Sequence, residues 1–222
     1  MSEISPDVRA QIEATPLVRE RPLIISDADE VLVAFMAAFE TYLEDQGYYF
    51  DWSGFRLTGA VRRQSDRELL PAEEVHAALL GFYDERTEKL EPVPGAVEAL
   101  DALSRRAQVV VLSNLPAAYG AARRRALAAQ GMAYPLIVNE GPKGPAVRLL
   151  AGSVDAPVFF LDDSPNHLKS VADHAADVRR LHFVHDQRLA GLIGPAPDSH
   201  HRTDTWAEAR AVIEDHLAAA GF

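Results

Sequence analysis

The stretch Leu23-Ile24-Ile25-Ser26-Asp27-Ala28-Asp29-Glu30-Val31 begins as an apolar run and then carries two aspartates one residue apart. The apolar run predicts a buried strand, so both carboxylates are expected where that strand meets solvent. At about 4 Å, two like charges repel by roughly 1 kcal/mol in water and by about 4 kcal/mol at the effective dielectric of a protein surface. A bound cation, or a raised pKa that keeps one acid protonated, offsets such repulsion, and both are typical of functional sites.

Further apolar runs follow the first one, and segments with helical spacing separate them. The runs that predict strands are 23–25, 109–112, 136–138 and 158–161, with a weaker one near 181–184. Their nearly continuous apolar character is typical of parallel strands covered on both faces. The main helical segments are 94–103, 117–130, 164–174 and 206–217. This alternation predicts an α/β fold, with a Rossmann-like parallel sheet sandwiched by helices.

The segment from about residue 33 to 91 breaks the alternation. It contains two amphipathic stripes, Phe35, Met36, Phe39, Tyr42 and Leu43 in the first and Val75, Leu79, Phe82 and Leu90 in the second. Helix followed by helix is therefore expected directly after the first strand. An insertion there lies above the carboxyl end of the strand, where ligands bind in open α/β sheets. We predict a helical cap subdomain at 33–91 and a core domain made of 1–32 and 92–222.

Composition and charge restrict the class of protein. The chain has 222 residues, of which 48% are hydrophobic, enough for one packed domain with a smaller subdomain. It has no cysteine, which excludes disulfides and thiolate metal sites. A net charge of −11 argues against binding to nucleic acid or to an anionic membrane. The polar, acidic start predicts no secretory signal and no apolar stretch predicts a membrane span, so we expect a cytoplasmic protein; the sequence does not indicate its oligomeric state.

Polar groups follow three of the predicted strands. They are Asp27 and Asp29 after the first, Ser113 and Asn114 after the second, and Asp162 and Asp163 after the fourth, with Lys143 ahead of an intervening helix. The carboxyl ends of parallel strands share one edge of a sheet, so these groups can meet in one pocket. Carboxylates without cysteine or histidine partners suit Mg²⁺, and a lysine and a hydroxyl beside them can hold phosphoryl oxygens. The set predicts phosphoryl transfer, with one aspartate as nucleophile and another moving a proton.

The order of these motifs resembles that of the haloacid dehalogenase superfamily of phosphohydrolases over about residues 22–185. The four matching segments are Asp27-Ala28-Asp29-Glu30-Val31, Val110-Val111-Leu112-Ser113-Asn114, Lys143, and Leu161-Asp162-Asp163. The helical insertion is similar to the small cap of the phosphoglycolate-phosphatase-like branch. Two positions depart from the family pattern, because Glu30 stands where many members have glycine and Gly144 separates the lysine from Pro145.

The resemblance implies a role for each motif residue. Asp27 would be the nucleophile and a Mg²⁺ ligand. Asp29 would be the general acid and base, with its backbone carbonyl also reaching the metal. Ser113 would bind a phosphoryl oxygen with Asn114 close by, and Lys143 would neutralise the nucleophile and the transferring group.

The resemblance also implies Mg²⁺ as the cofactor, and it completes the ligand set from the fourth motif. Asp163 would bind the metal directly, and Asp162 directly or through water. Arg56, in an arginine-rich stretch of the predicted cap, is a candidate contact for an anionic part of the substrate.

The leading expectation is a Mg²⁺-dependent phosphomonoester hydrolase of a small metabolite, acting through an aspartyl-phosphate. A phosphomutase stays open, because the same chemistry can return the phosphoryl group to another hydroxyl. A non-catalytic phospho-ligand binding or regulatory protein on this fold also stays open, although all four motifs are present. A receiver-type signalling module is disfavoured because its acidic pair follows the first strand, and the dehalogenase branch is disfavoured because it lacks the second aspartate, here Asp29.

Overall fold

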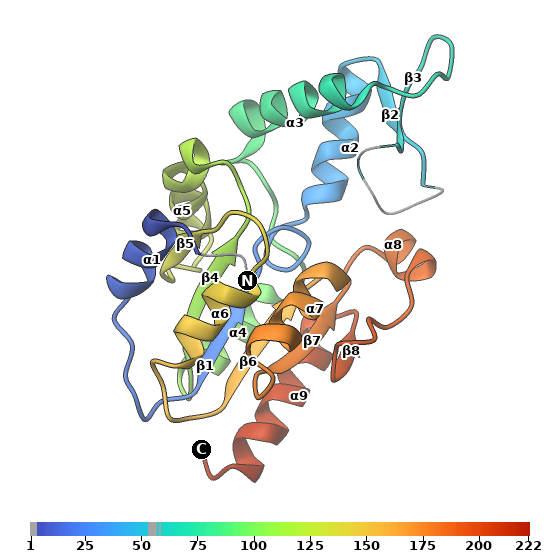
Figure 1. The fold of residues 1–222 in the computed structure, drawn as a ribbon. Helices are drawn as coiled ribbons and strands as arrows, with labels where there is room; N and C mark the ends of the chain where they lie inside the picture. Colours follow the sequence, from blue (N-terminus) through green and yellow to red (C-terminus); the bar gives the residue numbers. More distant parts are fainter. Residues whose placement is uncertain (1–3, 53–56, 58) are drawn as a thin grey trace.

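The apolar runs form a six-stranded sheet in the computed structural model, which describes residues 4–52, 57 and 59–222 (Figure 1). The strands are β1 (Leu23–Ser26), β4 (Gln108–Ser113), β5 (Leu136–Val138), β6 (Val158–Asp162), β7 (Arg179–Phe183) and β8 (His201–Thr203). Their order is β5-β4-β1-β6-β7-β8, and every pairing is parallel. The predicted parallel sheet is confirmed. The edge strand β8, which begins at His201, was not among the predicted strands.

Helices cover both faces of the sheet, because consecutive side chains of a strand point to opposite sides. Leu23 and Ile25 of β1 pack in a core with α1 (Pro6–Glu13), α6 (Gly144–Ala151) and α7 (Pro165–His174). Ile24 packs in the other core, with α4 (Ala96–Ser104) and α9 (Trp206–Ala219). This second core also includes residues of α5 (Gly120–Ala129), which follows the 3₁₀ turn η1 (Ala117–Tyr119), and of α8 (Gln187–Leu192). The helical sandwich and the α/β class are confirmed.

Between β1 and α4 the chain forms a unit that we call the cap. It contains α2 (Phe35–Asp45), β2 (Tyr48–Phe50), β3 (Val61–Arg63) and α3 (Ala72–Arg86). Both helices were predicted, but the antiparallel β2–β3 hairpin between them was not, and it corrects the expectation of helix followed by helix. In Figure 1 the cap lies at the end of the sheet away from the C-terminal end of α9.

Aromatic packing fixes the cap helices to each other. Phe82 of α3 packs edge-on against Phe35 and Phe39 of α2, with ring centroids 5.0 and 5.2 Å apart. These rings belong to the same apolar cluster as Ile24 of the sheet. Because this cluster runs from the cap into the sheet, the domain boundaries at residues 32 and 92 stay a prediction. No helix in the described part of the chain combines the length and apolarity needed to cross a bilayer.

Candidate functional site

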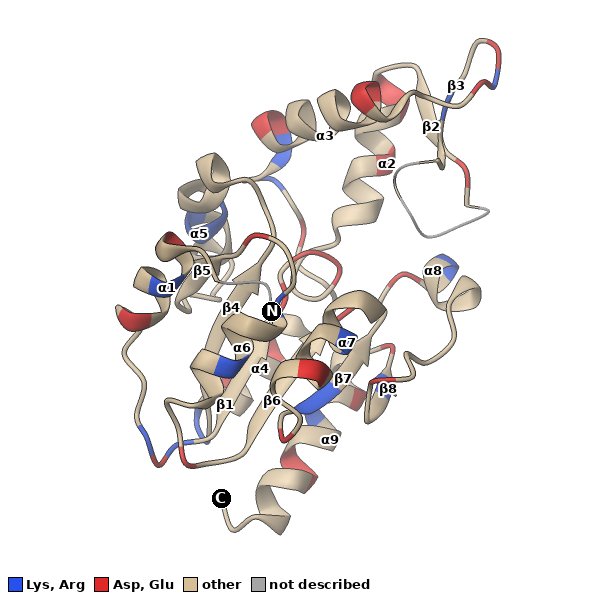
Figure 2. Ribbon diagram, viewed as in Figure 1, with Lys and Arg blue, Asp and Glu red and all other residues tan. Residues whose placement is uncertain are grey.

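The carboxyl ends of three neighbouring strands meet at the edge of the sheet below the cap. Asp27 directly follows β1, Ser113 ends β4 and Asp162 ends β6. β1 lies between the other two strands, with Ser26 level with Val111 of β4 and Leu161 of β6. Acidic segments gather in the loops between this edge and the cap (Figure 2). The topology therefore brings together side chains that are far apart in the sequence.

Lys143 lies immediately before α6 and is completely buried. Its Nζ lies 2.7 Å from Oδ1 of Asp27 and 2.7 Å from Oδ2 of Asp162. Burial alone would lower the pKa of Lys143, but the charges of Asp162 and Asp27 outweigh it and raise this pKa above its ordinary value. The ammonium is therefore charged, and it holds the two carboxylates in place.

Gly144 explains one departure from the family pattern. Its N–H donates to Oγ of Ser170 in α7 at 3.0 Å. A Cβ at this position would lie 2.1 Å from the carbonyl oxygen of Ser170, which is far too close for any side chain. Glycine is required here because α6 and α7 approach closely just where Lys143 enters the site.

Three carboxylates beside Lys143 form an all-oxygen cluster. Asp27, Asp162 and Asp163 each offer one oxygen within 4.8 Å of the others. Carboxylate oxygens are the ligands that Mg²⁺ takes in proteins. The donor set therefore fits this ion, while the side chain of Asp29 is not part of the cluster.

The two acids of the fourth motif differ in their partners. Asp162 accepts hydrogen bonds from Lys143 and from the backbone N–H of Ser164 at 2.9 Å. The Asp163 carboxylate has no hydrogen-bond donor among the residues described. Nδ1 of His182 accepts from the N–H of Ala196, so its Nε2 carries the hydrogen and donates to the Asp163 carbonyl at 3.0 Å. Asp163 thus has a fixed backbone and an unengaged carboxylate.

Burial and crowding change the acidity of the cluster. Burial raises the pKa of Asp27 to about 7, although the charge of Lys143 opposes the rise. Burial, together with the charges of Asp162 and Asp27, raises the pKa of Asp163 well above its ordinary value. Crowded carboxylates of this kind exchange protons for a divalent cation when one binds.

Ser113 ends β4, the strand that pairs with β1, and Asn114 follows it. The Ser113 hydroxyl is buried and has no hydrogen-bond partner within the described part of the chain, a situation that costs about 1–3 kcal/mol. Asn114 Nδ2 donates to the carbonyl of Gly141 at 2.8 Å, and Asn139 Nδ2 donates to Asn114 Oδ1 at 2.8 Å. Sequence analysis missed Asn139, which directly follows the predicted strand 136–138.

Asp29 contacts two side chains that sequence analysis also missed. Nη1 of Arg123, a completely buried residue of α5, lies 2.5 Å from Asp29 Oδ1. The hydroxyl of Tyr83, from α3 of the cap, donates to Asp29 Oδ2 at 3.5 Å. Arg123 is one of three consecutive arginines, and only the packing of α5 distinguishes it from Arg124 and Arg125.

Glu30 explains the other departure from the family pattern. Its φ of 61° lies in the left-handed region, which glycine enters without strain. The side chain is buried, with Oε1 accepting from the N–H of Met36 at 2.6 Å in the first turn of α2. Burial raises its pKa to about 7, and Oε2 has no partner among the described residues. The loop thus keeps the conformation that glycine favours, while the Glu30 side chain accepts a hydrogen bond at the start of α2.

A cavity of about 290 Å³ opens onto these groups. Asp27, Asp29, Asn114 and Asp163 line it from the core, and Phe35, Met36, Leu79 and Tyr83 line it from the cap. A neighbouring cavity of about 280 Å³ shares Leu79, Tyr83 and Asn114 with it. The cap therefore forms one wall of the site. Arg56 lies outside the described residues, so its contact with substrate stays a prediction.

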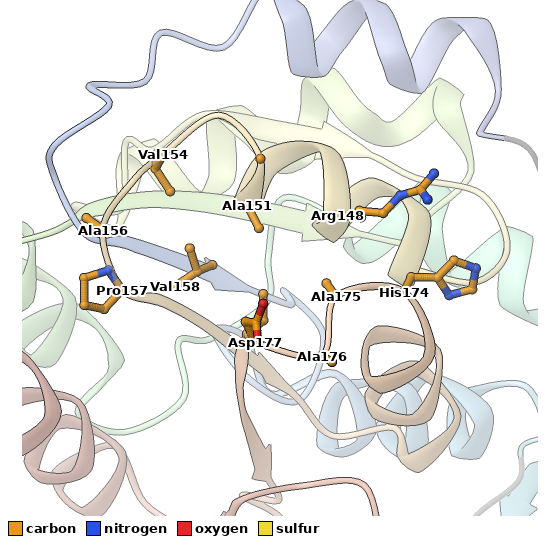
Figure 3. Close-up of a pocket in the computed structure, with 12 residues that line it drawn as sticks. Arg148, Ala151, Val154, Ala156, Pro157, Val158, His174, Ala175, Ala176 and Asp177 are labelled. Carbon is orange, nitrogen blue, oxygen red and sulfur yellow. The ribbon is translucent and has the colours of Figure 1, made fainter.

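A different cavity, of about 450 Å³, lies at the opposite edge of the sheet (Figure 3). Alanine and valine side chains make up much of its lining. Its charged residues, Arg148 and Asp177, are exposed, and they lie apart in Figure 3. None of the predicted site residues that the structure describes lines it. The chemistry of the side chains, and not the size of the cavity, therefore identifies the candidate site.

Comparisons with known proteins agree on the fold. No family model matches the chain, and neither does any curated protein. A conserved haloacid dehalogenase-like protein of unknown function from Agrobacterium tumefaciens is 19% identical, with a TM-score of 0.60 over 87% of this chain and 98% of that one. A HAD family hydrolase from Deinococcus radiodurans with bound phosphate and sodium is 16% identical, with a TM-score of 0.56 over 90% and 98%.

A third similar structure is a proposed HAD-hydrolase from Bacillus subtilis bound to magnesium. It is 14% identical, with a TM-score of 0.56 over 88% of this chain and 99% of that one. At such identities the likeness establishes the fold, which is that of haloacid dehalogenase-like proteins. The phosphoglycolate-phosphatase-like branch stays a prediction.

Proposed function

We propose that this protein is a Mg²⁺-dependent phosphomonoester hydrolase that acts on a small cytoplasmic metabolite through an aspartyl-phosphate on Asp27. The observation that carries the proposal is the buried ion triad in which Lys143 lies 2.7 Å from both Asp27 and Asp162. Removing ions from water costs several kcal/mol for each, and attraction within the triad offsets this only in part. A buried triad at the strand ends is therefore better explained by chemistry than by stability.

Asp27 would attack phosphorus through the carboxylate oxygen that Lys143 does not hold. The bond from this oxygen to phosphorus forms as the bond from phosphorus to the leaving alcohol oxygen breaks. Lys143 would offset the negative charge of the transferring group, and the unpaired hydroxyl of Ser113 would donate to one of its oxygens. Asn114 would lie at the edge of this phosphoryl subsite.

Asp29 would move the protons of both steps. It would give a proton to the departing alcohol oxygen, and would then take one from the water that attacks the aspartyl-phosphate. That second step breaks the bond between phosphorus and Asp27, releasing phosphate and restoring the free carboxylate. The place of Asp29 in the cavity wall, next to Asp27 but outside the acidic cluster, supports this separation of roles.

Asp27, Asp163 and Asp162, with the backbone carbonyl of Asp29, would hold Mg²⁺. When bound, this ion supplies positive charge that reduces the repulsion between the attacking carboxylate and the phosphate ester. The all-oxygen donor set and the unengaged carboxylate of Asp163 support this assignment. The magnesium bound by the similar Bacillus subtilis protein agrees with it.

The first test measures turnover of p-nitrophenyl phosphate and of a panel of small phosphomonoesters, with Mg²⁺ and with a chelator. Asp27→Asn should lower kcat by about 10⁴-fold or more, and Asp29→Asn by about 10²- to 10⁴-fold on alkyl esters. Asp155→Asn, an exposed aspartate paired with Arg19, is the matched control and should keep full activity. Unchanged rates in both site variants would contradict the mechanism.

Product analysis separates the alternatives that share this fold. Release of inorganic phosphate in step with the alcohol identifies a hydrolase. Return of the phosphoryl group to a second hydroxyl, without release of phosphate, identifies a mutase. Binding of phosphomonoesters without turnover of any of them would favour a non-catalytic protein.

A further inference from the structure

The pairing of Arg123 with Asp29 is a feature that the proposed chemistry does not explain. Arg123 comes from α5, beyond β4, and its side chain is completely buried. Nη1 lies 2.5 Å from Asp29 Oδ1, whereas Nε and Nη2 have no hydrogen-bond partner among the residues described. A buried guanidinium with unpaired donors is poor at stabilising a fold. Stabilisation of the fold therefore does not account for its burial beside Asp29.

The effect of this contact is to hold the Asp29 carboxylate from behind the cavity. Asp29 and Tyr83 line the cavity, whereas Arg123 is not among its lining residues. Tyr83 contacts the second oxygen, Oδ2, at 3.5 Å from the cap side. One oxygen is thus held firmly by the core and the other more loosely, at the surface that a substrate would reach. The side chain is also kept out of the acidic cluster formed by Asp27, Asp162 and Asp163.

We infer that Arg123 is a positioning residue, which orients Asp29 for proton transfer to the departing alcohol oxygen and, afterwards, from the attacking water. This inference rests on the proposed function, in which Asp29 gives its proton to the departing alcohol oxygen. Such a step matters greatly for an alkoxide leaving group, which is very basic. It matters little for dinitrophenolate, which departs without a proton.

The test compares kcat/KM for glycerol 2-phosphate and for 2,4-dinitrophenyl phosphate in the parent and in Arg123→Met. Because kcat/KM covers only the steps up to release of the alcohol, the later hydrolysis of the aspartyl-phosphate does not enter. The ratio of the two values is also independent of the fraction of protein that is folded. We expect the glycerol 2-phosphate value to fall by about 100-fold and the dinitrophenyl value by no more than about 3-fold.

Three further variants make the comparison specific. Arg123→Lys keeps a positive charge, so its kcat/KM for glycerol 2-phosphate, relative to that for the dinitrophenyl ester, should lie between those of Arg123→Met and the parent. It also provides the test if Arg123→Met does not fold. Tyr83→Phe should shift the ratio in the same direction by a smaller factor, since its contact is long. Arg125→Met is the matched control, because Arg125 is an exposed residue of the same helix that pairs with Glu88 of the segment after α3, and it should leave the ratio unchanged.

The outcomes separate this inference from the proposed function. If Asp29→Asn changes the ratio but Arg123→Met leaves it within about 2-fold of the parent, Arg123 is only structural and the inference is wrong. If the parent hydrolyses neither ester with Mg²⁺, or if Asp29→Asn leaves the ratio unchanged, the proposed role of Asp29 fails and the inference fails with it.

Discussion

The central sheet has a carboxyl edge, where its strands end, and an amino edge, where they begin, and the two differ in a way that cavity size does not reveal. The carboxyl edge has a cavity of about 290 Å³ beside a buried lysine and three crowded carboxylates. The amino edge has a cavity of about 450 Å³ lined largely by small apolar side chains (Figure 3). Buried charge is costly, and only the smaller of these two cavities has buried charges beside it, so it is the one that needs a functional explanation. Variants at the carboxyl edge, each compared with a control at the amino edge or at an exposed position, test this difference.

Replacing Lys143 by methionine should have the largest effect. It leaves Asp27 and Asp162 buried without their shared cation, which should lower the free energy of unfolding at neutral pH by about 3–5 kcal/mol. Phosphatase activity should be lost as well. Urea unfolding and phosphate release measure the two effects. Arg148→Met, in the wall of the other cavity, should change neither, and an equal loss in that control would remove the distinction between the edges.

The pH dependence of stability tests the burial of Glu30. A rise in the pKa of Glu30 from 4.5 to about 7 on folding corresponds to about 3 kcal/mol of folding free energy. Because the folded pKa is raised, the stabilising contribution is complete below about pH 4.5. It is lost as the pH rises through about 7, since the unfolded chain ionises first.

The experiment on Glu30 uses chelator-treated protein. Glu30→Gln keeps an acceptor for the N–H of Met36 and should be more stable than the parent at pH 8, by about 3 kcal/mol, with little difference near pH 4.5. Glu44→Gln, an exposed position of α2, is the matched control. If the free energies of unfolding of Glu30→Gln and of the parent change in parallel between pH 5 and 8, this carboxyl is not buried in solution.

Asp163→Asn should weaken metal binding more than it weakens the fold. Removing one charge from the carboxylate with unengaged oxygens should raise the Mg²⁺ concentration that gives half-maximal activity by about 10- to 100-fold. Titration of activity with Mg²⁺ measures the shift. Asp177→Asn makes the same change at the amino edge and should leave the titration where it is. Identical titrations for Asp163→Asn and the parent would exclude Asp163 as a ligand.

Gly144→Ala should lower the free energy of unfolding by about 1–3 kcal/mol. The added methyl group would meet the carbonyl oxygen of Ser170 at 2.1 Å, so α6 and α7 must separate near Lys143. Gly152→Ala, at the other end of α6 and in the wall of the amino-edge cavity, has its closest neighbour at 3.3 Å and should cost less. Thermal unfolding of the two variants measures the difference. Equal losses of stability would mean that the close contact between α6 and α7 is unimportant.

The core of the fold could be predicted because its signals are local. The five apolar runs that predicted strands all form strands, and the helical segment predicted at 206–217 lies within α9. Short, half-polar elements were harder. Each strand of the β2–β3 hairpin and the strand β8 is only three residues long, and β3 (Val61–Arg63) and β8 (His201–Thr203) are mostly polar.

The sequence by itself determined which groups follow the strands of a parallel sheet. Asp27, Ser113 and Asp162 could be placed at one edge because strand polarity requires it. Only the tertiary structure decided which polar residues became buried. Arg123 is enclosed while its neighbours Arg124 and Arg125 are exposed, and Glu30 turns inward to cap α2. The physical reason is that burial depends on how helices from distant parts of the chain pack together, which no local pattern of residues specifies.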